Sequence, residues 1–165
     1  MFIRDAFTRL TLVLEEVDAT GVTSGATSLP DLRLKARLRS STQSSRLMAF
    51  SALTDRIWLS GPDCALFLNA LSDLNRTRCG SAEIASQSPD SFRLRIAATD
   101  RAGHILAEGH VGGSFLGVRQ QHIQSSVCYS IEIGPTYLPQ LFAAFRALLA
   151  LPDPLSVQSR TGGVA

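Results

Sequence analysis

The sequence predicts an α+β domain, with a mostly antiparallel sheet of about seven strands and two amphipathic helices packed on one face. In several segments apolar and polar residues alternate, as they do on a strand with one buried face. Two other segments carry apolar residues three and four positions apart, which is typical of a helix with one buried stripe. Short connections between neighbouring strands favour antiparallel hairpins over crossover units.

The N-terminal third is predicted to hold three strands. Residues 9–15 alternate between leucines and mostly polar residues, and a loop rich in Thr, Ser and Gly follows over 19–30. Residues 32–39 alternate strictly, so that the apolar side chains face the core and the cations face away. A turn is expected at 40–45 and a further strand at 46–53.

A helix is predicted from about residue 62 to Asn75. Ser60 is suited to cap its first turn, which contains Pro62 and Asp63. The apolar stripe consists of Cys64, Phe67, Leu68, Leu71 and Leu74.

The second half is predicted to hold four more strands and the last helix. The strands fall at 81–86, 92–96, 105–115 and 123–133, and the glycines of the third suggest a bulge. Thr136 is expected to cap the last helix, which Pro152 and Pro154 would end. The sequence therefore predicts a single α+β domain over residues 1–151 and a flexible C-terminal tail over 152–165.

Composition bounds the classes of partner. The 165 residues are 45% apolar and 18% charged, which fits a globular protein. The net charge is only +2, whereas nucleic-acid binders usually carry a larger positive excess, so nucleic acid is disfavoured as a partner. No run approaches the ~18 apolar residues that span a bilayer, and no membrane partner is expected. Three well-separated cysteines fit reduced thiols, and the predicted location is cytoplasmic.

Metal and thiol chemistry find little support in the sequence. His104, Glu108 and His110 share one strand face, but the two histidines are about 20 Å apart on an extended strand. Cys128 and His122 would both face away from the core, and nothing nearby in sequence polarises that thiol. No phosphate-binding loop or nucleophile elbow is present. The sequence thus predicts no catalytic residues, no metal and no cofactor.

Alternating cations are the clearest surface feature. A solvated sheet face with cross-strand ion pairs would explain them, and so would a docking surface for an acidic partner. Few aromatic residues accompany the cations, so base stacking is not supported. The candidate binding residues are Arg33, Lys35, Arg37, Arg39, Arg93 and Arg95.

The C-terminal segment from Tyr129 to Leu149 resembles the end of the WapI-type family of small bacterial immunity proteins. The most specific element is the run Thr136-Tyr137-Leu138-Pro139 at the start of the last helix. The order of strands and mid-chain helix is also similar upstream. The resemblance implies a cytosolic, non-enzymatic binding protein that neutralises a polymorphic toxin. Because immunity proteins against nucleases tend to be acidic, the slightly basic charge argues against a nuclease target.

Three functional hypotheses follow. The first is a non-enzymatic protein-binding or immunity module whose partner, a toxin domain, docks on the cationic face. The second is a small metal- or thiol-dependent enzyme that uses His104, His110, His122 or Cys128. The third is a homodimer in which open sheet faces or edge strands pair.

Overall fold

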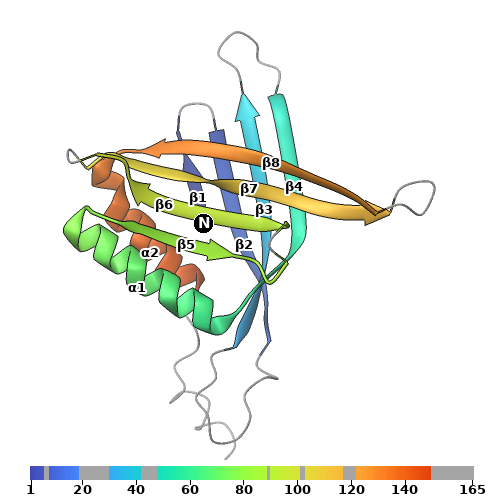
Figure 1. The fold of residues 1–165 in the computed structure, drawn as a ribbon, viewed down its shortest axis with the longest axis horizontal. Helices are drawn as coiled ribbons and strands as arrows, with labels where there is room; N and C mark the ends of the chain where they lie inside the picture. Colours follow the sequence, from blue (N-terminus) through green and yellow to red (C-terminus); the bar gives the residue numbers. More distant parts are fainter. Residues whose placement is uncertain are drawn as a thin grey trace, which may run out of the picture.

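The structure is a computed structural model that describes residues 1–5, 8–18, 30–41, 48–88, 90–100, 103–116 and 122–149. Within these ranges it contains two four-stranded antiparallel sheets and two α-helices (Figure 1). The predicted α+β class is confirmed, with the refinement that the strands divide between two sheets. Most of the predicted loop at 19–30 and turn at 40–45, and the whole predicted tail at 152–165, lie outside the described residues.

The first sheet, called sheet A, has the order β1-β2-β3-β4. Its strands are β1 (Phe2–Arg4), β2 (Thr8–Asp18), β3 (Asp31–Ser41) and β4 (Met48–Leu59). Strand β1 was not predicted, because three residues are too few to show an alternating pattern. Its central residue, Ile3, is fully buried. The short strand therefore contributes to the core while its neighbours Phe2 and Arg4 point outward.

The second sheet, called sheet B, has the order β5-β6-β7-β8. Its strands are β5 (Ser81–Ala85), β6 (Phe92–Ala98), β7 (Ile105–Leu116) and β8 (His122–Ile133). The β7–β8 hairpin is long and extends beyond the edge of sheet A (Figure 1). The strands of the two sheets cross each other in the same view.

Each sheet is followed by a helix, so four strands and one helix occur twice in the chain. Helix α1 (Gly61–Thr77) follows sheet A, and α2 (Leu138–Leu148) follows sheet B after a short 3₁₀ turn, η1 (Pro135–Tyr137). The predicted cap of α1 is confirmed, since the Asp63 amide donates to Ser60 Oγ at 3.2 Å. The helix runs slightly past its predicted end.

The predicted cap of the last helix is wrong. Thr136 lies inside η1 and is exposed, and neither η1 nor α2 has a side-chain hydrogen bond at its N-cap. The 3₁₀ turn supplies the helix entry instead, because the Tyr137 amide donates to the Gly134 carbonyl oxygen at 2.9 Å. Pro139 falls in the first turn of α2, where a missing amide hydrogen costs nothing.

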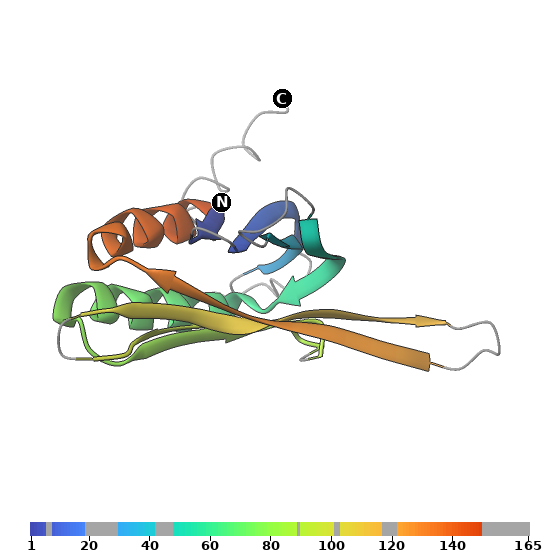
Figure 2. The same ribbon diagram turned by 90° about the horizontal axis from the view of Figure 1, so that it is seen from above.

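One continuous core holds the molecule together. The inner faces of both sheets and the apolar stripes of both helices contribute to it. The helices lie side by side at one end of the molecule (Figures 1 and 2), where Phe67 of α1 meets Phe145 of α2 edge to face at 5.0 Å between ring centroids. Such a contact adds roughly 1 kcal/mol beyond the burial of the rings. Because each sheet buries its inner face, its outer face presents the polar side chains.

No helix in the described ranges has both the length and the apolar character needed to cross a bilayer.

Candidate binding surface

The six predicted cations do not share one face. Arg33, Lys35, Arg37 and Arg39 lie on β3 of sheet A, whereas Arg93 and Arg95 lie on β6 of sheet B. The two sheets meet through their inner faces in the common core. Their outer faces therefore look away from each other, and a single ligand lying flat on one of them does not reach the other set.

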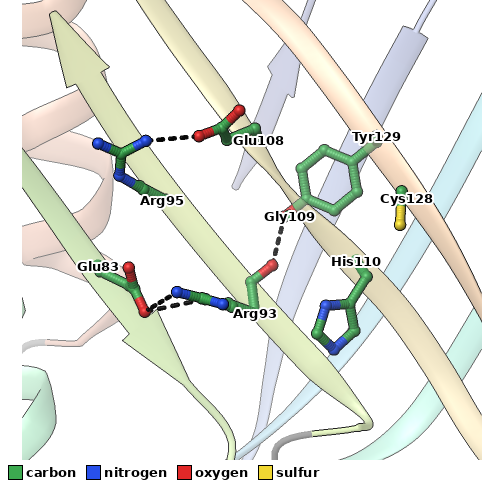
Figure 3. A pocket seen from close by; sticks show the side chains of 8 residues that line it. All are labelled: Glu83, Arg93, Arg95, Glu108, Gly109, His110, Cys128 and Tyr129. Carbon is green, nitrogen blue, oxygen red and sulfur yellow. Dashed lines mark hydrogen bonds and ion pairs between the residues drawn. The ribbon is translucent and has the colours of Figure 1, made fainter.

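The two arginines of sheet B are paired with carboxylates. Arg93 Nη2 lies 2.8 Å from Glu83 Oε1, and Arg95 Nη1 lies 2.7 Å from Glu108 Oε1. These four side chains surround a depression of about 450 Å³ (Figure 3). The register brings these groups together, because Arg95 sits directly opposite Glu108 on β7 and Glu83 on β5. Arg93 reaches Glu83 diagonally, two positions along the neighbouring strand. The sheet B face is thus electrically balanced at these positions.

Tyr129, a buried residue of β8, also lines this depression. Tyr129 on β8 lies opposite Gly109 on β7 and donates a hydrogen bond to the Arg93 carbonyl oxygen on β6 at 3.0 Å. Tyr129 therefore bridges β8 to β6 across β7. A Cβ at position 109 would lie only 1.9 Å from that same carbonyl oxygen. Position 109 requires glycine, because a side chain there would occupy the space that the hydrogen bond from Tyr129 needs. Burial raises the pKa of the Tyr129 phenol, so the hydroxyl group stays protonated and can donate this bond.

The outer face of sheet A is uneven in charge. At the end of this face where β3 begins, Glu16 lies 3.1 Å from Arg33, and Glu15 lies 3.8 Å from both Arg33 and Lys35. Trp58 on β4 is directly opposite Arg33, whose guanidinium carbon is 6.0 Å from the ring centroid. This end combines an aromatic ring with cations that are largely neutralised.

The other end of the same face gathers four arginines. Arg4, Arg9 and Arg39 are directly opposite one another on β1, β2 and β3, and Arg37 follows on β3. All four are exposed. Within the described part of the chain none of them has a carboxylate at ion-pair distance, in contrast to Arg33, Lys35, Arg93 and Arg95. We call Arg4, Arg9, Arg37 and Arg39 the arginine cluster.

Phe2 is part of the same surface. The guanidinium carbons of Arg9 and Arg4 lie 4.5 Å and 5.5 Å from its ring centroid. Phe2 remains 37% exposed, so part of the ring faces solvent. Sequence reasoning missed Phe2, Arg4, Arg9 and Trp58, because no periodic pattern links them to the cations of β3. Only the pairing of strands places them together, and it gives the cationic face aromatic neighbours that the sequence pattern does not reveal.

Between the two ends the face is partly apolar. Val13 on β2 and Leu53 on β4 are 47% and 54% exposed. Val13 is opposite Lys35, and Leu53 is opposite Arg37. Exposed aliphatic side chains among cations are compatible with a ligand that has both charged and apolar parts.

The structure brings together only some of the residues considered for metal or thiol chemistry, since Glu108, His110 and Cys128 line the depression on sheet B. His104 precedes β7 and pairs with Asp100, which raises the pKa of the imidazole through a hydrogen bond and its charge. His110 lies opposite Cys128 on the outer face of sheet B, while the side chain of His122 lies outside the described residues. Among the described residues, no three His, Cys, Asp or Glu side chains are grouped to hold a metal ion. Burial raises the pKa of the Cys64 thiol to about 12.

The comparisons with known proteins add a fold relationship. No family model and no curated protein matches the sequence. The crystal structure of WHY1 from Arabidopsis thaliana is similar, with a TM-score of 0.55 and 14% identity over 98% of this chain and 88% of that chain. A likeness at this identity shows the fold alone.

This likeness corrects one expectation about partners. The sequence disfavoured nucleic acid because the net charge is small, yet WHY1, which has a similar fold, binds single-stranded nucleic acid. A net charge averages over the whole surface, so a small value does not by itself exclude nucleic acid. Sheet B pairs its arginines with glutamates, whereas the arginine cluster concentrates positive charge on one end of sheet A.

Proposed function

We propose that the protein is a non-enzymatic module that binds single-stranded nucleic acid on the outer face of sheet A. The observation that carries the proposal is the arginine cluster. Arg4, Arg9 and Arg39 occupy directly opposed positions on three neighbouring strands. Like charges opposite each other destabilise a sheet by a few tenths of a kcal/mol to ~1 kcal/mol. A bound anion offsets this cost.

Phosphate is the anion that this arrangement suits best. A guanidinium presents several N–H donors in a fixed plane and pairs with phosphate through two parallel hydrogen bonds. Phosphate contacts supply most of the sequence-independent affinity in nucleic-acid complexes. The cluster therefore accounts for attraction and positioning, and it carries no base preference of its own.

The aromatic side chains favour a single strand over a duplex. Phe2 lies inside the cluster, and Trp58 lies beside Arg33 at the opposite end of β3. Stacking on an aromatic ring requires a base face that is free of its neighbours, which a single strand offers and a duplex hides. Each such stack contributes about 1–3 kcal/mol. The fold shared with WHY1 supports the same class of ligand.

The test is fluorescence anisotropy with labelled single-stranded DNA and RNA and with a duplex of the same sequence. We expect the single strands to bind more tightly, and the double variant Arg9→Ala, Arg37→Ala to lose most of the affinity. The salt slope of log affinity should fall by about 0.7 for each phosphate contact removed.

The matched control is Arg93→Ala, Arg95→Ala, which removes the same number of arginines from sheet B. It should bind like the unaltered protein once folding is verified by circular dichroism. Equal loss of affinity in both double variants would mean that net charge, and not this face, governs binding. No binding to any single strand at low salt would refute the proposal.

A second candidate function is protein binding of the immunity type, which the C-terminal resemblance implies. The observation that favours it is the exposure of Leu53 and Val13 beside the cations of β3. Exposed aliphatic side chains are common in the centre of protein interfaces. Leu53→Ser would abolish capture of a protein partner while leaving the salt-dependent binding of a single strand nearly unchanged.

A further inference from the structure

We propose that the arginine cluster together with Phe2 forms a subsite for a terminal phosphate, a phosphomonoester at one end of the bound strand. This inference rests on the proposed function. It goes further, because it assigns the chemical group that occupies one end of the surface.

Arg4, Arg9 and Arg39 form a row across three neighbouring strands. This row is short enough for all three guanidinium groups to reach one phosphate group. Neighbouring strands are ~4.8 Å apart, so the backbone positions of Arg4, Arg9 and Arg39 span ~10 Å. An arginine side chain is long enough for the outer two to reach a group held above the middle one. Arg4 and Arg9 also approach the same Phe2 ring, at 5.5 Å and 4.5 Å from its centroid. The ring limits the orientations of both guanidinium groups before any ligand arrives.

The charge of the cluster exceeds what one internal phosphate neutralises. A phosphodiester within a strand carries one negative charge, while a phosphomonoester carries about −1.5 to −2 at neutral pH and offers three acceptor oxygens. Three opposed guanidinium groups, with no carboxylate at ion-pair distance among the described residues, match the second group better. The fourth, on Arg37, lies two residues along β3, where the next phosphate of the strand would follow.

Charge along β3 falls away from the cluster. Arg39 and Arg37 are exposed and unpaired within the described residues, whereas Glu15 and Glu16 neutralise Lys35 and Arg33. From Arg39 to Arg33 the strand covers ~20 Å. A ligand with its most negative group at one end fits this gradient when that end lies on the cluster and the rest extends toward Trp58.

The arginines on sheet B differ from those of the cluster, because each of them has a glutamate partner. Arg93 and Arg95 each form an ion pair with a glutamate on a neighbouring strand, at 2.8 Å and 2.7 Å. At the corresponding cross-strand positions of the row, Arg9 faces arginine on both sides. The row thus leaves charge for a ligand that sheet B does not leave.

The experiment compares three single-stranded oligonucleotides of one sequence, with a 5′-phosphate, with a 3′-phosphate, or with hydroxyl groups at both ends. Each competes with a labelled strand for the unaltered protein, for Arg9→Ala, Arg39→Ala, and for the sheet B control Arg93→Ala, Arg95→Ala. We expect one phosphorylated end to improve affinity about tenfold, as the gain of a charge-assisted contact predicts. The gain should persist in the control and disappear in Arg9→Ala, Arg39→Ala. Which end shows it sets the direction of the strand.

Inorganic phosphate provides a second measurement that needs no oligonucleotide. It should raise the melting temperature of the unaltered protein more than that of Arg9→Ala, Arg39→Ala. If all three oligonucleotides bind the unaltered protein equally, the terminal-phosphate subsite is refuted and the proposed function stands. If none of them binds, both are refuted. A phosphate gain that survives in Arg9→Ala, Arg39→Ala would place the subsite elsewhere and overturn the assignment.

Discussion

Arg9 on β2 lies directly opposite Arg39 on β3, so two positive charges occupy a single cross-strand pair. A pair of this kind is a cost to the sheet, and its removal should make the unliganded protein more stable. The next arginine in the row, Arg4, adds to the same repulsion from β1. The opposed arginines therefore lower the stability of the folded protein, whereas the proposed binding of phosphate requires them.

Arg39→Thr should stabilise the protein by roughly 0.5 kcal/mol at low salt, because it removes the repulsion and retains a good strand-forming residue. Urea unfolding in dilute buffer measures the change, which should shrink as salt screens the charges. Arg95→Thr is the matched control. It breaks the pairing with Glu108 and should leave stability unchanged or slightly lower it. A loss of stability in Arg39→Thr would show that the pair is not repulsive.

Gly109→Ala should destabilise the protein by about 3 kcal/mol, since the added methyl group meets the Arg93 carbonyl and the Tyr129 hydroxyl. Gly113→Ala on the same strand is the control, because a Cβ there has no atom within 4 Å. Its effect should stay within about 0.5 kcal/mol. Chemical unfolding of both variants gives the comparison. Similar values for the two would contradict the close packing of β6, β7 and β8 at Gly109.

Ser60→Ala should cost about 1 kcal/mol of stability, because Ser60 Oγ accepts from the Asp63 amide at the start of α1. Thr136→Ala should cost almost nothing, because Thr136 makes no capping bond at the start of α2. Thermal unfolding of the two variants side by side measures the difference. A larger loss of stability in Thr136→Ala than in Ser60→Ala would show that Thr136 caps the last helix, as the sequence alone predicts.

The pair of His104 and Asp100 predicts a dependence of stability on pH. The hydrogen bond to Asp100 and its charge raise the pKa of His104 in the folded protein above the ordinary value near 6.5. The folded state therefore binds this proton more tightly, and the added stability is present below the unfolded pKa. It is lost as pH rises through the raised folded pKa. His104→Gln should remove this component from unfolding curves measured between about pH 5 and 9, and an unchanged pH profile would count against the pair.

Most of the fold could be predicted because alternation and helical spacing report burial directly. Strand β3 shows this best, with every second residue from Leu32 to Leu38 buried. The division into two sheets could not be predicted, because periodicity shows which face of a strand is buried but does not show which element packs against that face. Strand β1 was not predicted, because Phe2–Arg4 is too short to show an alternation of apolar and polar residues.

The candidate site was predicted only in part, for a related reason. Arg37 and Arg39 stand out in the alternating run of β3, and the structure places both on an open face. Arg4 and Arg9 join them through register, which depends on pairing between segments that the sequence does not align. The apparent equivalence of Arg93 and Arg95 to the β3 cations failed for the same cause, as their glutamate partners come from neighbouring strands.

Four strands and a helix occur twice along the chain, and each set of strands forms its own sheet. If two identical subunits each supplied one sheet, both outer faces would carry the same residues, and every substitution would appear on both. Here the two outer faces are made by different residues of one chain, so each face can change without the other. The ion pairs on sheet B beside the opposed arginines on sheet A are an asymmetry that a pair of identical subunits cannot have.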